Sequence, residues 1–165
     1  MNTAGLMAIL VLLLAACTGE PETGPIPVKW DRDACERCRM VLSDRYHSAQ
    51  VRWTPEGKRS QVMKFDDIGC AALWLQDKPW KNAATTEIWV TDHRSGDWID
   101  ARLATYVMGH LTPMEYGLGA QSDPVPDGMD FTQALQHIQE IEKRFNAHGV
   151  QLQEQLRMRE MEHNH

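Results

Sequence analysis

Two pairs of β-rich segments, separated by one short helical segment, constrain the fold of this chain most. Residues 46–54 and 60–65 are joined by "PEGKR", whose Pro and Gly are turn residues. Residues 66–76 follow, with Asp66 as the expected N-cap and apolar residues at helical spacing. Residues 86–92 and 97–101 then flank the turn "HRSG". The pattern predicts an α+β fold, a small β-β-α-β-β unit whose helix packs on an antiparallel sheet.

The C-terminal part predicts a helical extension of this unit. Residues 102–111 are apolar without a clear period, and "QSDPVPDG" at 121–128 has the composition of a linker. Asp130 can cap a following helix that ends at "HG", residues 148 and 149. Its expected apolar side comprises Phe131, Leu135, Ile138 and Phe145. The remainder is helical in propensity but has few apolar positions to bury, so we expect it to fray.

Length and charge narrow the class of protein. The 165 residues, 42% of them apolar, suffice for one domain with a hydrophobic core. The formal net charge is −6 and no long basic run occurs, which argues against nucleic acid as a partner.

The N-terminus has the pattern of an exported lipoprotein. Residues 1–16 contain no charged side chain and form an apolar stretch too short for a mature membrane span, as in a signal peptide. They end in "LAA" before Cys17, which resembles the lipobox of bacterial lipoproteins and implies that Cys17 is lipidated. Residues 17–29 have the composition of a flexible tether. We therefore expect a periplasmic protein anchored to a membrane, and Thr18 rather than Asp after the cysteine favours the outer one.

Three cysteines remain beyond the expected anchor, and three is an odd number for an oxidising compartment. They are Cys35, Cys38 and Cys70. A structural zinc site usually needs two close pairs of ligands, and the chain has one C-x-x-C, although Cys70 with a distant His could complete a set. A thioredoxin-like redox pair would follow a strand and begin a helix, whereas this C-x-x-C precedes a hairpin.

Met40 introduces a third interpretation of the same motif. A thioether two residues after Cys38 adds a second soft donor, and soft donors select Cu(I) over harder divalent ions. In an extended or knuckle-like backbone the two side chains can project to one side. A methionine followed by Val41 and Leu42 is also a common core residue, so the spacing alone leaves copper binding open.

Four separated blocks of the sequence together resemble the NosL family. They are "CERCRM" at 35–40, "KFDDIGC" at 64–70, "WVTDHRSGDWIDA" at 89–101 and "TPMEYGLGA" at 112–120. The resemblance covers about residues 30–120, leaving 121–165 as a linker and C-terminal helical tail. It implies a copper-binding lipoprotein that carries Cu(I) in the periplasm. It also implies delivery to apo nitrous oxide reductase, together with that enzyme's membrane-bound maturation complex, for assembly of the copper-sulfide centre.

The resemblance also implies particular ligands. The family's Cys-x-Met element falls on Cys38 and Met40, with Cys35 close enough to contribute. The candidates for a further ligand, left unranked, are Met114, Met63, His110 and Cys70. Asp66 and Asp67 are interpreted as an N-cap and a first-turn carboxylate. The C-terminal side chains of Met158, Met161, His163 and His165 form a weaker second candidate site.

Motifs for catalysis are lacking in the sequence. It contains no G-x-S-x-G elbow, no H-E-x-x-H and no phosphate-binding Gly loop. We therefore expect a binding and delivery protein rather than an enzyme. The alternative function is a periplasmic thiol-disulfide oxidoreductase that uses Cys35 and Cys38.

Overall fold

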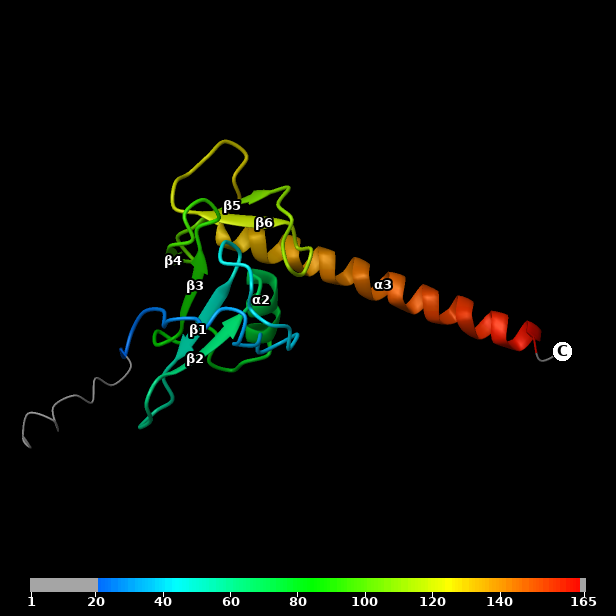
Figure 1. The fold of residues 1–165 in the computed structure, drawn as a ribbon, viewed down its shortest axis with the longest axis horizontal. Helices are drawn as coiled ribbons and strands as arrows, with labels where there is room; N and C mark the ends of the chain where they lie inside the picture. Colours follow the sequence, from blue (N-terminus) through cyan, green and yellow to red (C-terminus); the bar gives the residue numbers. More distant parts are fainter. Residues whose placement is uncertain (1–20, 164–165) are drawn as a thin grey trace, which may run out of the picture.

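The computed structural model describes residues 21–163, and Figure 1 shows them as a mixed α+β body from which one long helix extends. The predicted signal peptide and lipidated Cys17 lie outside the described residues. Within the described part, none of the helices combines the length and apolar character needed to cross a membrane. The α+β class predicted from the sequence is confirmed.

A four-stranded antiparallel sheet forms the centre of the body. Its strand order is β2-β1-β3-β4, so the first hairpin pairs with the second through β1 and β3. Ala49 of β1 lies opposite Phe65 of β2 on one side and Val90 of β3 on the other. The strands are β1 (Ala49–Trp53), β2 (Gln61–Phe65), β3 (Glu87–Thr91) and β4 (Trp98–Asp100). Both predicted strand pairs are therefore present.

Helix α2 (Ile68–Gln76) follows β2 directly and packs on β1 and β2. Its N-cap is Asp67, whose Oδ1 accepts a hydrogen bond of 2.8 Å from the Gly69 N–H. The prediction that Asp66 caps this helix is wrong by one residue. Because Asp67 satisfies the free N–H at the helix start, the Asp66 side chain is available for another contact.

A second, smaller hairpin comprises β5 (Thr105–Met108) and β6 (Leu118–Gln121). The segment whose type was open in the sequence thus contributes strand β5, which pairs with β6 on one side and with Met129 on the other. Residues 109–117 form the loop between the two strands, and His93, after β3, donates its N–H to Ala120 O at 2.8 Å. The smaller hairpin is thereby tied to the end of β3.

Helix α3 (Phe131–His163) starts as predicted but extends further. Asp130 Oδ1 accepts from the Gln133 N–H at 2.8 Å, and Gln133 Oε1 accepts from the Asp130 N–H at 2.9 Å, which is a reciprocal capping box. The prediction that the helix ends at residues 148 and 149 is wrong. Glycine in a helix interior costs about 1 kcal/mol, and the following Gln, Leu, Glu, Arg and Met residues favour helix strongly enough to continue it.

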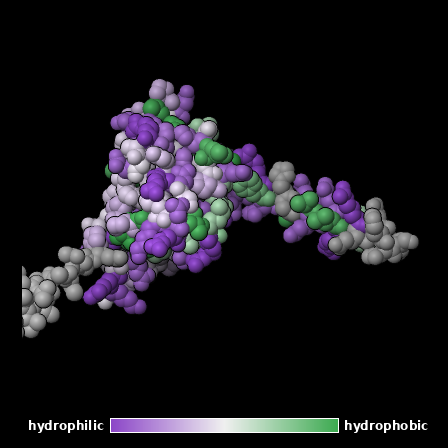
Figure 2. All heavy atoms as spheres, in the orientation of Figure 1, coloured by the Kyte–Doolittle hydropathy of each residue, from purple (hydrophilic) through white to green (hydrophobic). Residues whose placement is uncertain are grey.

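The hydrophobic core lies between the sheet, α2 and the first turns of α3. Val51, Phe65, Ile68 and Val90 are buried there, together with Ile138 of α3. The later turns of α3 project from the body, and Figure 2 shows apolar and charged side chains mixed along them. The exposed apolar residues of this projecting part are Phe145, Val150, Leu152, Leu156, Met158 and Met161.

The segment predicted as a tether contacts the sheet from Gly24 onward. The Gly24 N–H donates to Glu87 Oε2 at 2.7 Å, and Gly24 O accepts from Arg52 Nε at 2.7 Å. Ile26 exchanges two hydrogen bonds with the side-chain amide of Gln50, at 2.9 and 2.8 Å. Residues 24–26 therefore lie against β1 and β3, the two central strands of the sheet.

Candidate metal centre

Four potential metal ligands converge at the N-terminal end of α2. The sulfur atoms of Cys35, Cys38 and Cys70 and a carboxylate oxygen of Asp66 all lie within 4.8 Å of one another. We call these four residues the cysteine cluster. None of its three cysteines forms a disulfide. Among the described residues no other group of three or more Cys, His, Asp or Glu side chains meets this spacing.

The C-x-x-C-x-M segment supplies two of these sulfurs from a tight turn. Arg39 donates its N–H to Cys35 O at 3.1 Å, and Cys35 donates its N–H to Met40 O at 2.7 Å. Arg39 has φ 66°, in the left-handed region. The Glu36 N–H donates to Lys64 O at 2.9 Å, so the turn is attached to β2. The knuckle-like backbone considered from the sequence is the one observed.

Asp66 completes the cluster from the end of β2. Its Oδ2 lies 3.1 Å from Cys38 Sγ, which donates to it as a thiol. Its Oδ1 is buried and has no hydrogen-bond partner. A buried carboxylate oxygen without a partner is costly, and a bound cation would remove that cost.

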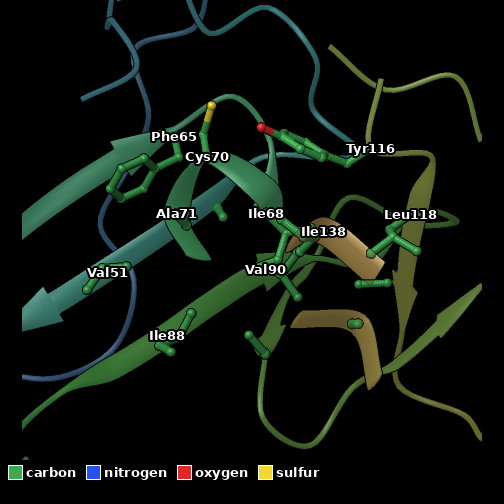
Figure 3. Close-up of a cluster of buried hydrophobic side chains, with 14 of the residues drawn as sticks. Val51, Phe65, Ile68, Cys70, Ala71, Ile88, Val90, Tyr116, Leu118 and Ile138 are labelled. Carbon is green, nitrogen blue, oxygen red and sulfur yellow. The ribbon is translucent and has the colours of Figure 1, made fainter. Parts of the chain in front are cut away.

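Cys70 lies in the first turn of α2 and contacts a polar network that extends to α3. Arg37 Nη1 lies 3.9 Å from Cys70 Sγ and 3.3 Å from the Tyr116 hydroxyl. Arg37 Nη2 and the Tyr116 hydroxyl both donate to Glu142 of α3, at 2.7 and 2.8 Å. Figure 3 shows the Tyr116 hydroxyl directed toward Cys70 at the edge of the buried core. The network holds α3 and the turn that carries Arg37 in place around the Cys70 thiol.

The pKa values of the three thiols differ because of their mutual contacts and their burial. A hydrogen bond from the Cys70 thiol lowers the pKa of Cys35 to about 6 and raises the pKa of Cys70. Burial, followed by contacts with Asp66 and Cys35, raises the pKa of Cys38 to about 12. Cys35 is therefore the first thiolate of the cluster, while Cys38 must lose a proton to bind a metal ion.

The sulfur donors differ in how far their side chains are exposed to solvent. Cys35 and Cys70 are fully buried, Cys38 is half-buried, and the Met40 side chain is 49% exposed. The interpretation of Met40 as a core residue therefore fails. Met63 and Met114, in contrast, are half-buried and pack against the hydrophobic core. The Met114 N–H contacts Asp67 Oδ2 at 3.4 Å, which places its loop beside the residue that follows Asp66.

His110, another candidate ligand, contacts a different group of residues. Its ring centroid lies 4.3 Å from that of His93 and 5.6 Å from that of His47, and it is not part of the cysteine cluster. Of the C-terminal candidates, Met158 and Met161 are exposed on α3, and His165 lies outside the described residues.

Asp66 was not predicted from the sequence as a member of the cluster. Its position before an apolar helical pattern favoured the N-cap, and nothing in the sequence separates it from Asp67 in that role. The spacing from Asp66 to Cys70 spans the start of one helix, which was a signal for a shared site once Asp67 is recognised as the cap.

A family model and a solved structure are similar to this chain. The model of the NosL family matches residues 26–121, more than half of the chain. The crystal structure of the copper chaperone NosL from Shewanella denitrificans aligns with 73% of this chain and 88% of that chain. The alignment has 18% sequence identity and a TM-score of 0.48. A search of curated proteins finds no match.

Proposed function

This chain belongs to the NosL family, and on that premise we propose that it is a copper chaperone that binds Cu(I) at the cysteine cluster. The observation that carries the proposal is the convergence of three cysteine sulfurs beside a half-exposed methionine. Thiolate and thioether sulfurs are soft donors, and soft donors favour Cu(I).

Cys38 and Met40 are the proposed primary ligands because they are the accessible donors of the motif. A partner protein can reach a metal ion held at this side, whereas Cys35 and Cys70 are buried behind it. Few and accessible ligands allow the ion to be exchanged to the ligands of a partner, as delivery requires.

Asp66 has a proposed role in controlling this exchange. Its carboxylate accepts the Cys38 proton in a hydrogen bond and disfavours the free thiolate beside it. Binding of Cu(I) replaces that proton, and release of the ion restores the hydrogen bond. The neutral thiol gives the empty site a stable state, which helps the ion to leave.

The proposed destination is apo nitrous oxide reductase, in concert with its membrane-bound maturation complex, for assembly of the copper-sulfide centre. Lipidation of Cys17 would hold the protein at the periplasmic face of a membrane. Thr18, the residue after the cysteine, favours the outer membrane. Confinement to a surface raises the encounter rate with partners. In this function the protein delivers an ion and catalyses no reaction.

The alternative function in thiol-disulfide exchange fits the cluster less well. The thiol with the lowered pKa is Cys35, which is fully buried, and the half-buried Cys38 has a raised pKa. An oxidoreductase needs the opposite arrangement, an accessible thiolate that attacks the substrate disulfide.

Titration of the reduced protein with Cu(I), in competition with a chelator of known affinity, tests the proposal. We expect Cys38→Ser and Met40→Ala each to weaken Cu(I) binding by at least about tenfold, the effect seen even for outer partners of a metal ligand. Met108→Ala is the matched control, since Met108 is 64% exposed on β5, and it should bind as wild type does.

Two results would contradict copper delivery. One is a Met40→Ala variant that binds Cu(I) as tightly as wild type while Cys35→Ser abolishes insulin-reductase activity, which would support the redox function. The other is a wild-type protein from which Zn²⁺ displaces Cu(I) at equal concentration, which would make the cluster a structural zinc site.

A further inference from the structure

Three histidines that are far apart in the sequence meet on the same side of the smaller hairpin. His47 precedes β1, His93 follows β3, and His110 lies in the loop between β5 and β6. The His110 ring is the common neighbour, with centroid distances of 4.3 Å to His93 and 5.6 Å to His47. We call these residues the histidine cluster. The proposed copper site uses none of them.

His47 is oriented in the manner of a metal ligand. Its Nδ1 lies 2.9 Å from Asp44 Oδ2, and a carboxylate on one ring nitrogen is the usual outer partner of a metal-binding imidazole. The other nitrogen, Nε2, is buried and has no hydrogen-bond partner. Buried polar atoms normally have a hydrogen-bond partner. An imidazole nitrogen that lacks one, next to other histidines, therefore indicates a place where a ligand can bind.

The other two rings are supported by β6. His110 lies against Gly119, where a Cβ atom would be 2.7 Å from the His110 ring, so only glycine admits the ring at this position. His93 Nε2 lies 3.2 Å from Gln121 Oε1, which leaves its Nδ1 for another contact. Burial, followed by the charges of His93 and His47, lowers the pKa of His110, so this ring is neutral and able to bind a metal ion at neutral pH.

We propose that His47, His93 and His110 form a second metal site, which takes a borderline divalent cation, Zn²⁺ or Cu²⁺, through imidazole nitrogens. Imidazole is the ligand that both ions accept readily, in contrast to the soft sulfur ligands of the cysteine cluster. In the structure the rings pack against each other, and their nitrogens do not yet surround one point. Binding therefore includes rotation of the His110 ring about χ2, a torsion whose energy wells are broad.

The test uses the full chain, reduced and labelled with ¹⁵N-histidine, after its sulfur ligands have been filled with Ag⁺. We expect one equivalent of Zn²⁺ to shift the ring-nitrogen resonances of His47, His93 and His110. His110→Ala should remove these shifts and weaken Zn²⁺ binding by at least about tenfold. Cu²⁺ is added in a parallel experiment, where electron paramagnetic resonance reports nitrogen ligands and the two affinities show which ion the site prefers.

Two further variants keep the test decisive. If His110→Ala does not fold, Asp44→Asn retains all three rings and should weaken Zn²⁺ binding by about ten- to a hundredfold, because the orienting carboxylate is lost. The double variant His163→Gln/His165→Gln removes tail histidines and should bind as wild type does. Loss of binding in this control, shifts confined to other histidines, or binding of neither ion to the wild type would overturn the proposal.

Discussion

The cysteine cluster and the histidine cluster are assembled in different ways. Two sulfurs of the first come from one six-residue turn, and its remaining members, Asp66 and Cys70, lie four residues apart around the start of α2. The three rings of the second come from three connections that only the strand order brings together. Local sequence therefore encodes each half of the cysteine cluster, and the fold joins the two halves, whereas every member of the histidine cluster is brought in by the topology.

One loop connects the two clusters. Residues 109–117 carry His110 near one end and Tyr116 near the other, and Tyr116 belongs to the network around Cys70. Each ring lies against a glycine, Tyr116 on Gly69 and His110 on Gly119. The clusters differ in chemistry but share this support.

The largest effect is expected for Gly69→Ala, which tests how far the clusters are independent. In a helix this change ordinarily stabilises by about 1 kcal/mol. Here the new Cβ would lie 2.1 Å from the Tyr116 ring, and overpacking of this kind costs about 3 kcal/mol. We expect a net loss of stability of about 2 kcal/mol in urea unfolding.

The same variant should disturb both clusters if the loop links them. Displacement of Tyr116 would break its contact with Arg37 and shift the ring resonances of His110. A Gly69→Ala protein that is more stable than wild type would contradict the close approach of the ring. Unchanged His110 resonances in a destabilised protein would show that the loop does not couple the two sites.

The dependence of metal affinity on pH distinguishes the clusters by their chemistry. Cys35, with its pKa lowered to about 6, is already a thiolate above that pH, whereas Cys38, with its pKa raised to about 12, still carries its proton. If both are ligands, one proton leaves per Cu(I) between pH 7 and 9. The affinity should therefore rise about tenfold per pH unit, or about a hundredfold over this range.

Zn²⁺ affinity at the histidine cluster should change little over the same range. The pKa of His110 is lowered, so its ring is neutral above pH 7 and no proton on this ring competes with the metal ion. Competition titrations at pH 7, 8 and 9 measure both slopes. If the logarithm of the Cu(I) affinity does not change with pH, Cys38 is not a ligand. A slope of two in that logarithm per pH unit would add Cys70 as a third thiolate.

Much of the fold was predictable from local patterns. The turn residues between paired strands identified both hairpins of the large sheet, and Asp130 identified the start of α3. The end of α3 could not be predicted in this way, because a lone glycine destabilises a helix by less than the surrounding residues stabilise it. The type of the segment that forms β5 was also left open, since its pairing with β6 depends on residues across a nine-residue loop.

The candidate site, like the fold, was predictable where it depends on local spacing. Cys38 and Met40 stand out in the sequence because two soft donors are two residues apart, and the structure leaves both near the surface. The contact of Asp66 with Cys38 and the grouping of His47 with His93 and His110 depend on which segments lie side by side. No spacing in the sequence reports that, so these contacts had to come from the structure.

The smallest effect concerns the backbone of the turn that carries the proposed ligands. The loop with His110 has glycine at two of its three left-handed positions, Gly109 and Gly117. The cysteine turn instead places Arg39 in this conformation, which costs a residue with a Cβ about 1 kcal/mol. Glycine removes that strain but gains freedom in the unfolded chain, so Arg39→Gly should stabilise the protein by about 0.5 kcal/mol.

Arg39→Lys provides the matched control, since it keeps the Cβ and the charge. The ion pair of Arg39 with Glu36 spans 3.6 Å between two exposed side chains and contributes little, so this variant should unfold at the wild-type urea concentration. Cu(I) affinity should stay within about twofold of wild type in both variants, because 0.5 kcal/mol corresponds to about that factor. A destabilised Arg39→Gly protein, or one with much tighter Cu(I) binding, would show that the left-handed turn is tuned to the ion rather than merely tolerated.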